Sequence, residues 1–125
     1  MSAYKDFLKE YRIEEDLLDK VVRGLFSSEY SYWLSVESHY NADVSLGFSG
    51  SLEDWIIKRL VSEEYVLVEV EDEYDPYDLY IGDLVDGFVY LIEDESLSYE
   101  FWDAEDYSII FQYAMFSDIR YEREL

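Results

Sequence analysis

The sequence has no cysteine, a single proline, a single histidine and only nine lysine and arginine residues among its 125 positions. The lack of thiols excludes disulfide bonds, thiolate metal sites and cysteine nucleophiles. No window approaches 18 uncharged apolar residues, and the N-terminal segment has no long apolar run, so neither a membrane span nor a secretion signal is predicted. These absences indicate a soluble, cytoplasmic protein.

Acidic side chains dominate the charge. Asp and Glu number 31 against 9 Lys and Arg, which gives a formal net charge of −22 and a pI near 4.1. Binding to phosphates requires clustered Lys and Arg, so direct binding of nucleic acid is not expected, and a partner should be basic. Half of the residues are hydrophobic and 19% are aromatic, whereas charged disordered chains are poor in aromatics. We therefore expect a folded domain.

The apolar pattern predicts one α+β domain over residues 1–125, with helices packed on one face of a small, mostly antiparallel sheet. Residues 1–25 are predicted to be a helical N-terminal segment. Helices are predicted over residues 3–10, 14–23, 52–62, 84–92 and 104–116. Strands are predicted over residues 30–40, 65–70, 79–81 and 118–122, with a loop or short strand over 41–50 and a turn over 72–78.

Capping signals define the predicted helix starts. A short polar side chain that can accept a free N–H group stands just before each apolar pattern. These residues are Ser2, Ser51 with Asp54 three positions later, Asp83 and Asp103. Gly24 is expected to end the second helix, since glycine is favoured just past a helix C-terminus.

The negative charge is concentrated in the second half of the chain. Residues 60–119 contain no Lys or Arg and carry 18 acids, so they account for −18 of the −22. A domain of this length is about 36 Å across, and B-DNA of that length carries roughly 21 phosphates. Because neighbouring carboxylates repel one another and lower stability, this concentration favours a use for the negative field.

We therefore predict an acidic face that binds the basic, DNA-contacting cleft of another protein. The candidate partner-binding residues follow the central apolar strand and continue through the next helix: Glu69, Glu71, Asp72, Glu73, Asp75, Asp78, Asp83, Asp86, Glu93, Asp94 and Glu95. The acidity is also compatible with two roles that need no partner. The acids can serve solubility alone, or they can reflect adaptation to high salt, with which so many aromatic residues agree poorly.

The sequence carries no pattern for catalysis, for metal binding or for a cofactor. An EF-hand that starts at Asp72 fails, because Tyr74 and Pro76 stand where oxygen ligands are required. A carboxylate pair of the glycosidase type is expected by chance among 31 acids. The sequence has no nucleophile motif such as G-x-S-x-G with which His39 could act in catalysis. His39 is therefore expected in a turn or on the surface. The protein is therefore predicted to be non-enzymatic, with no cofactor and no metal.

Aromatic residues are expected to fill the core. Trp33 falls on a predicted strand, Trp55 on the apolar face of a predicted helix, and Trp102 just before a helix cap. Fourteen tyrosines exceed what a core of this size can bury, so some are predicted to provide exposed contact area. The candidates beside the acidic turn are Tyr74, Tyr77 and Tyr80.

Three segments carry a resemblance to known proteins: YSYW at residues 30–33, GDLVDG at 82–87 and DAEDYSIIFQYAMF at 103–116. Through them the chain, over about residues 28–121, resembles a family of small acidic bacteriophage proteins of unassigned function. Family members have Gly after the last Phe and end in Val-Tyr-Gly, whereas this chain has Ser117 and Arg120-Tyr121-Glu122. The resemblance implies a phage origin and transfers no catalytic residue.

A phage origin favours interference with the host, since phages encode acidic DNA mimics that block restriction enzymes and CRISPR complexes. The expected function is a non-enzymatic DNA mimic with anti-restriction or anti-CRISPR activity, which acts in the host cytoplasm on a DNA-binding defence protein. The alternative is a phage accessory protein that acts through a Tyr-rich or apolar contact patch, for which a homodimer is one arrangement.

Overall fold

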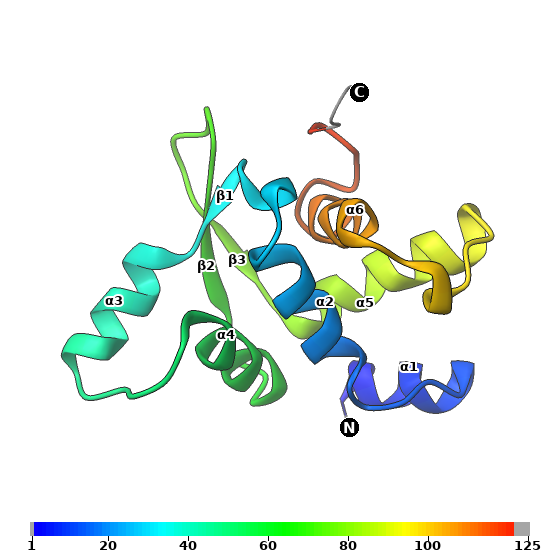
Figure 1. Ribbon diagram of the computed structural model, residues 1–125, viewed down its shortest axis with the longest axis horizontal. Coiled ribbons are helices and arrows are strands. Elements are labelled where there is room, and N and C mark those ends of the chain that lie inside the picture. Colours follow the sequence, from blue (N-terminus) through cyan, green and yellow to red (C-terminus); the bar gives the residue numbers. More distant parts are fainter. Residues whose placement is uncertain (1, 122–125) are drawn as a thin grey trace.

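The computed structural model describes residues 2–121, which form helices around a small antiparallel sheet (Figure 1). The α+β class is thus confirmed. The α-helices are α1 (Ala3–Tyr11), α2 (Leu17–Phe26), α3 (Glu37–Ser45), α4 (Leu52–Val61), α5 (Ile81–Val89) and α6 (Ala104–Phe116). The strands are β1 (Leu34–Ser35), β2 (Val66–Val70) and β3 (Tyr77–Leu79), and the shorter helical turns are η1 (Glu29–Ser31), η2 (Tyr90–Asp94) and η3 (Tyr99–Phe101).

The sheet has the order β1-β2-β3, and both strand pairs are antiparallel. Val66 at the start of β2 lies opposite Leu79 of β3. Val66, Val68 and Val70 are buried while Glu69 is exposed, as the alternation of side chains along a strand requires. The predicted strand over 65–70 is confirmed, and it directs one face into the core.

The hairpin predicted after residue 70 is present, but its second strand covers residues 77–79 instead of 79–81. Ile81 already belongs to α5, so this helix begins before Asp83. The backbone N–H of Tyr80 donates to Asp83 Oδ2 at 3.0 Å. Asp83 therefore stabilises the first turn from inside the helix, and its predicted place just before the helix is wrong.

Close helix contacts determine the positions of two glycines. Helices α2, α5 and α6 lie together in the centre of the molecule (Figure 1). A Cβ on Gly87 would lie 2.5 Å from the carbonyl oxygen of Ile110, and one on Gly24 would lie 2.4 Å from the ring of Tyr107. Gly24 does not end the second helix, which continues to Phe26. Its role is the close approach of α2 to α6.

The region from residue 12 to residue 50 departs most from the prediction. Helix α2 begins at Leu17 instead of Glu14, after a left-handed residue at Arg12. The strand predicted over 30–40 shrinks to the two residues of β1, between η1 and α3. The predicted loop over 41–50 is helical as far as Ser45.

Helix α3 is held by side-chain hydrogen bonds between it and other segments. Its sequence has no helical apolar stripe, and none of its residues is fully buried. The indole N–H of Trp55 donates to Asp43 Oδ2 at 2.8 Å, and the Tyr40 hydroxyl donates to the carbonyl of Gly50 at 2.6 Å. Tertiary contacts thus decide the conformation of α3.

Two of the predicted caps are confirmed. Ser51 Oγ accepts from the N–H of Asp54 at 3.1 Å, and Asp103 exchanges two hydrogen bonds with Asp106 at the start of α6. Ser2 stands before α1, but its side chain makes no capping hydrogen bond. The helices over 3–10, 52–62 and 104–116 are therefore predicted well.

After α6 the chain does not form the predicted edge strand over residues 118–121, and Glu122 lies outside the described residues. Backbone groups of this segment bond to a side chain of α6 instead, as described below. Among residues 2–121, no helix combines the length and the apolar composition that crossing a bilayer requires.

Candidate protein-interaction surface

The β2–β3 hairpin projects away from the helices (Figure 1). Its connection runs through residues 71–76, where Asp72 takes a left-handed conformation with φ of 65°. Tyr74 at its tip is 99% exposed. Six of the predicted binding residues lie on this hairpin, all of them exposed, and we call them the hairpin acids: Glu69, Glu71, Asp72, Glu73, Asp75 and Asp78.

One hairpin acid is neutralised by a basic residue. Arg120 Nη1 lies 2.7 Å from Glu73 Oε1, which also accepts from the Tyr77 hydroxyl at 3.1 Å. Within residues 2–121, no hydrogen bond or ion pair engages the side chains of the other five hairpin acids. These five carboxylates therefore face solvent, and no residue among 2–121 compensates their charge by direct contact.

The other five predicted residues lie on α5 and η2 or directly after them, and we call them the helix acids: Asp83, Asp86, Glu93, Asp94 and Glu95. Glu93 accepts from the Tyr11 hydroxyl at 2.7 Å, and Glu95 accepts from the Tyr90 hydroxyl at 2.8 Å. Asp83 is used in the first turn of α5. Most of the helix acids thus have structural partners.

The structure divides the predicted acidic face into two groups. In Figure 1 the hairpin extends at the upper left, whereas the end of α5 and the segment after it lie on the right, beyond α6. The expectation of one continuous face over all eleven residues therefore differs from the arrangement found. On the hairpin the acids are close in sequence, and all of them except Glu73 lack a hydrogen-bond or ion-pair partner among residues 2–121.

Two tyrosines, one beside each group of acids, have raised pKa values. Burial raises the pKa of Tyr121, and the nearby Asp72, Glu73 and Glu71 raise it further. The carboxylate of Glu93, bound to the hydroxyl of Tyr11, raises the pKa of that tyrosine to about 12. These hydroxyls stay protonated near neutral pH and act as donors.

The predictions for the exposed tyrosines hold in part. Tyr74 is fully exposed and Tyr80 is exposed, while Tyr77 is half-buried and touches Phe116. All three tryptophans are buried, as predicted, although Trp33 precedes β1 instead of lying on a strand. The tip of the hairpin therefore offers one large aromatic side chain among the acids.

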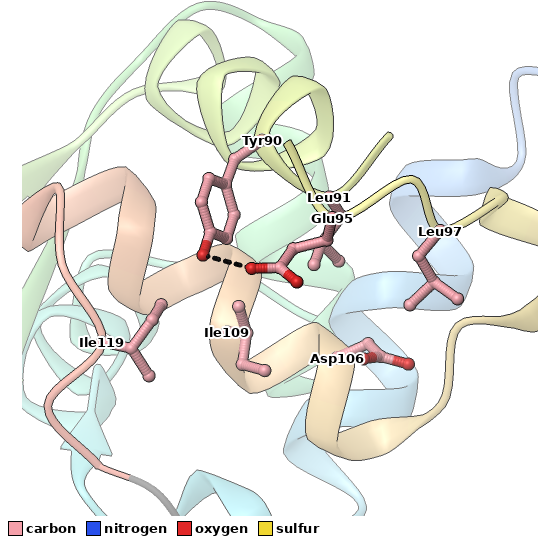
Figure 2. A pocket seen from close by; sticks show the side chains of 7 residues that line it. All are labelled: Tyr90, Leu91, Glu95, Leu97, Asp106, Ile109 and Ile119. Atoms are coloured by element: carbon pink, nitrogen blue, oxygen red, sulfur yellow. Dashed lines mark hydrogen bonds between the residues drawn. The ribbon is translucent and has the colours of Figure 1, made fainter. Parts of the chain in front are cut away.

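A pocket of about 280 Å³ lies between η2 and α6. Figure 2 shows the Tyr90 hydroxyl bonded to Glu95 on one side, with Asp106 and Ile109 of α6 on the other. Burial raises the pKa of Asp106, whose carboxylate also accepts from the N–H of Asp103. The remaining lining side chains are aliphatic: Leu91, Leu97 and Ile119. Its polar groups are thus two carboxylates, of Glu95 and Asp106, and the hydroxyl of Tyr90.

A buried polar network, which the sequence reasoning missed, anchors the segment after α6. Gln112 is fully buried, and its Oε1 accepts from the N–H groups of Arg120 and Tyr121 at 2.7 and 2.6 Å. Its Nε2 donates to the carbonyl of Tyr121 at 2.9 Å and to Ser108 Oγ at 3.1 Å. Ser108 in turn accepts from the indole of Trp33 at 2.9 Å. The one signal in the sequence was a glutamine within an apolar helix pattern.

His39 also differs from its prediction. It lies on α3, not in a turn, and its Nδ1 accepts from the N–H of Leu67 at 3.0 Å. Its ring stacks on Tyr65 and meets Trp55 edge-on. Burial lowers the pKa of His39, and the charge of Arg59 lowers it further. His39 therefore supports the sheet as a neutral acceptor.

No group of three or more His, Asp or Glu side chains is positioned to hold a metal ion in the part of the chain that the structure describes. The case for a function of the hairpin acids therefore rests on their charge and their exposure. No protein-family model, no curated protein and no solved structure matches this chain. The kinship with small acidic phage proteins stays a prediction.

Proposed function

We propose that this protein is a phage-encoded, non-enzymatic inhibitor that acts as a DNA mimic. Its target would be a host DNA-binding defence protein of the restriction or CRISPR type, whose basic cleft receives the hairpin acids. The observation that carries the proposal is the projecting hairpin, on which five exposed carboxylates have no cationic partner among residues 2–121.

Electrostatics gives this surface two properties that suit a mimic. A net charge of −22 attracts a basic cleft over a distance that salt limits to about 10 Å at 0.1 M. Long-range attraction of this kind raises association rates and suppresses binding to acidic partners. The complex should therefore form fast at low salt and weaken as salt rises.

The hairpin also supplies contact area. Tyr74 projects from its tip, and tyrosine adds rigid, amphipathic area to protein interfaces. A DNA-binding cleft contains aromatic and arginine side chains against which such a ring can pack. Tyr74 would thus strengthen a complex that charge alone makes sensitive to salt.

The first prediction concerns four of the hairpin acids that have no ion-pair partner among residues 2–121. Changing Glu71→Gln, Asp72→Asn, Asp75→Asn and Asp78→Asn together should weaken the complex at least about tenfold, or about 1.4 kcal/mol. The protein is immobilised, host lysate is applied at low salt, and bound DNA-binding proteins are eluted with duplex DNA. Affinity for the recovered target is then measured at several salt concentrations.

The matched control removes the same charge elsewhere. Glu10→Gln, Glu14→Gln, Glu15→Gln and Asp19→Asn change four exposed acids on the N-terminal segment. This variant should keep most of its affinity and differ mainly in the association rate. Equal losses in the two variants, or a bound protein that duplex DNA does not displace, would reject the mimic.

A further inference from the structure

Arg120 and Tyr121, which follow α6, contact residues from three parts of the fold. We call this set of residues the tail groove: Gln112 and Phe116 of α6, Trp33 before β1, and Glu71 and Glu73 of the hairpin. Arg120 and Tyr121 pair with no strand, and Ile119 instead lines the pocket between η2 and α6. The tail groove is therefore a binding site for two consecutive residues, and the protein's own chain fills it.

Gln112 binds backbone groups of Arg120 and Tyr121. Its amide binds two consecutive N–H groups and one carbonyl, and its fourth hydrogen bond goes to Ser108. All the donors and lone pairs of the side chain are thus used. With Arg120 and Tyr121 in place Gln112 is fully buried, and their backbone groups supply the hydrogen bonds that a buried glutamine needs.

Two side chains of the bound segment are recognised as well. The guanidinium of Arg120 lies 2.7 Å from Glu73 Oε1 and 4.2 Å from the centre of the Phe116 ring. Tyr121 stacks on Trp33 with 5.1 Å between ring centres and 8° between planes. Its hydroxyl donates to the carbonyl of Glu71 at 2.8 Å. The groove selects a cation followed by an aromatic ring.

We propose that the tail groove is a recognition site for an arginine–aromatic dipeptide of a partner protein, and that Arg120 and Tyr121 compete with it. The recognition groups do not depend on the covalent link to α6, so the same contacts can be made by another chain. Charge complementarity favours a basic partner, because Glu71, Asp72 and Glu73 surround the groove. Release of the tail would then expose Trp33 and Gln112 to the incoming segment.

The test uses the peptide acetyl-Ser-Asp-Ile-Arg-Tyr-amide, which copies residues 117–121. It is titrated by calorimetry into the full-length protein and into the variant with Arg120→Ala and Tyr121→Ala. The variant has lost the competing side chains, so it should bind the peptide at least about tenfold more tightly than the unchanged protein. A peptide with glutamate in place of its arginine should not bind either protein.

A third variant adds Glu73→Gln to the double change and should lose much of the affinity gained. Circular dichroism verifies folding, and if the double variant is unfolded, Tyr121→Ala alone must show the same gain. Equal affinity in all three proteins, or no binding to any, overturns the proposal. So does light scattering that shows dimers with exchanged tails, which would make the occupant a second copy. No host protein enters this test, so its outcome is independent of DNA mimicry.

Discussion

His39 completes the hydrogen bonding of β2 at a place where β1 is too short to do so. β1 pairs only with Val70 and Glu69, and the N–H of Leu67 therefore donates to the imidazole Nδ1. This geometry requires a bare Nδ1, so the ring is neutral and carries its proton on Nε2. Arg59 beside the ring, which also binds Asp43, opposes a positive charge there.

The second prediction follows from this pKa. A histidine whose pKa in the folded protein lies below 6.5 binds fewer protons than in the unfolded chain. Its contribution to stability is therefore present above pH 6.5 and is lost as the pH falls from there through the lower pKa of the folded protein. His39→Asn keeps an acceptor oxygen near the place of Nδ1 and does not titrate. The free energy of unfolding, measured between about pH 7.5 and 5, should therefore fall more in the unchanged protein than in this variant.

The other charges near the ring are the same in the unchanged protein and in His39→Asn. Asp43 on α3 and Asp78 on β3 raise the pKa of His39, whereas burial and Arg59 on α4 lower it. His39→Ala removes the acceptor altogether and should cost about 1–3 kcal/mol at pH 7.5. Parallel pH curves for the unchanged protein and His39→Asn would show that the histidine stays out of the titration.

Helix α5 carries two glycines with opposite requirements. A Cβ on Gly87 would meet the backbone carbonyl of Ile110 at 2.5 Å, whereas a Cβ on Gly82 would meet nothing within 4 Å. The contact at Gly87 involves backbone, which cannot rotate away as a side chain can. The approach of α5 to α6, and through it the place of η2, thus depends on one missing methyl group.

The third prediction compares alanine at these two positions. Gly87→Ala should destabilise the fold by about 1–3 kcal/mol, because the helices must separate. Gly82→Ala should stabilise it by about 0.5–1 kcal/mol, because alanine favours the helix and no contact is disturbed. Denaturant unfolding of the two variants measures both signs. A stabilising Gly87→Ala would mean that α5 and α6 are not in close contact.

The success of the sequence-based prediction varied from element to element for physical reasons. Helix α6 was predicted to the residue because Asp103 and Asp106 form a local cap before an apolar pattern. Strand β2 was found because three alternate valines point into the core. Where local chemistry and burial agree, the sequence is sufficient.

The sequence-based prediction missed elements whose conformation depends on residues far away in the chain. Helix α3 depends on Trp55 and Arg59 of another helix, and no residue of α3 is fully buried, so its own sequence has no helical pattern. The candidate acids were chosen by their place in the chain as one face, and six of the eleven lie on the hairpin. Sequence proximity could not reveal that Glu93 and Glu95 bond to tyrosines, one of them 82 positions away.

Few ion pairs join residues within the described part of the chain. They engage a small share of the acids: Asp16, Asp43, Asp54, Glu64 and Glu73. Repulsion among the rest opposes folding. Stability must come from the apolar core that joins the helices and the sheet.

The fourth prediction follows from this repulsion. Raising NaCl from about 0.02 M to about 0.5 M shortens the range of electrostatic interactions several-fold, so the melting temperature should rise. We expect a shift of about 4 °C or more, which corresponds to about 1 kcal/mol in a domain of this size. The variant with four neutralised hairpin acids should start from a higher melting temperature and respond less to salt. A melting temperature independent of salt would contradict a destabilising field.

Two arginines border the acidic stretch, by which we mean residues 60–119, and both pack against aromatic rings. Arg59 lies over Trp55 and Tyr65, and Arg120 lies over Phe116. Trypsin cleaves after basic residues, so it can release residues 60–120 only as one long fragment. Cleavage at either border of the folded protein first requires an arginine to leave its ring. Peptide maps of the acidic stretch accordingly need a protease that cuts at carboxylates or aromatics.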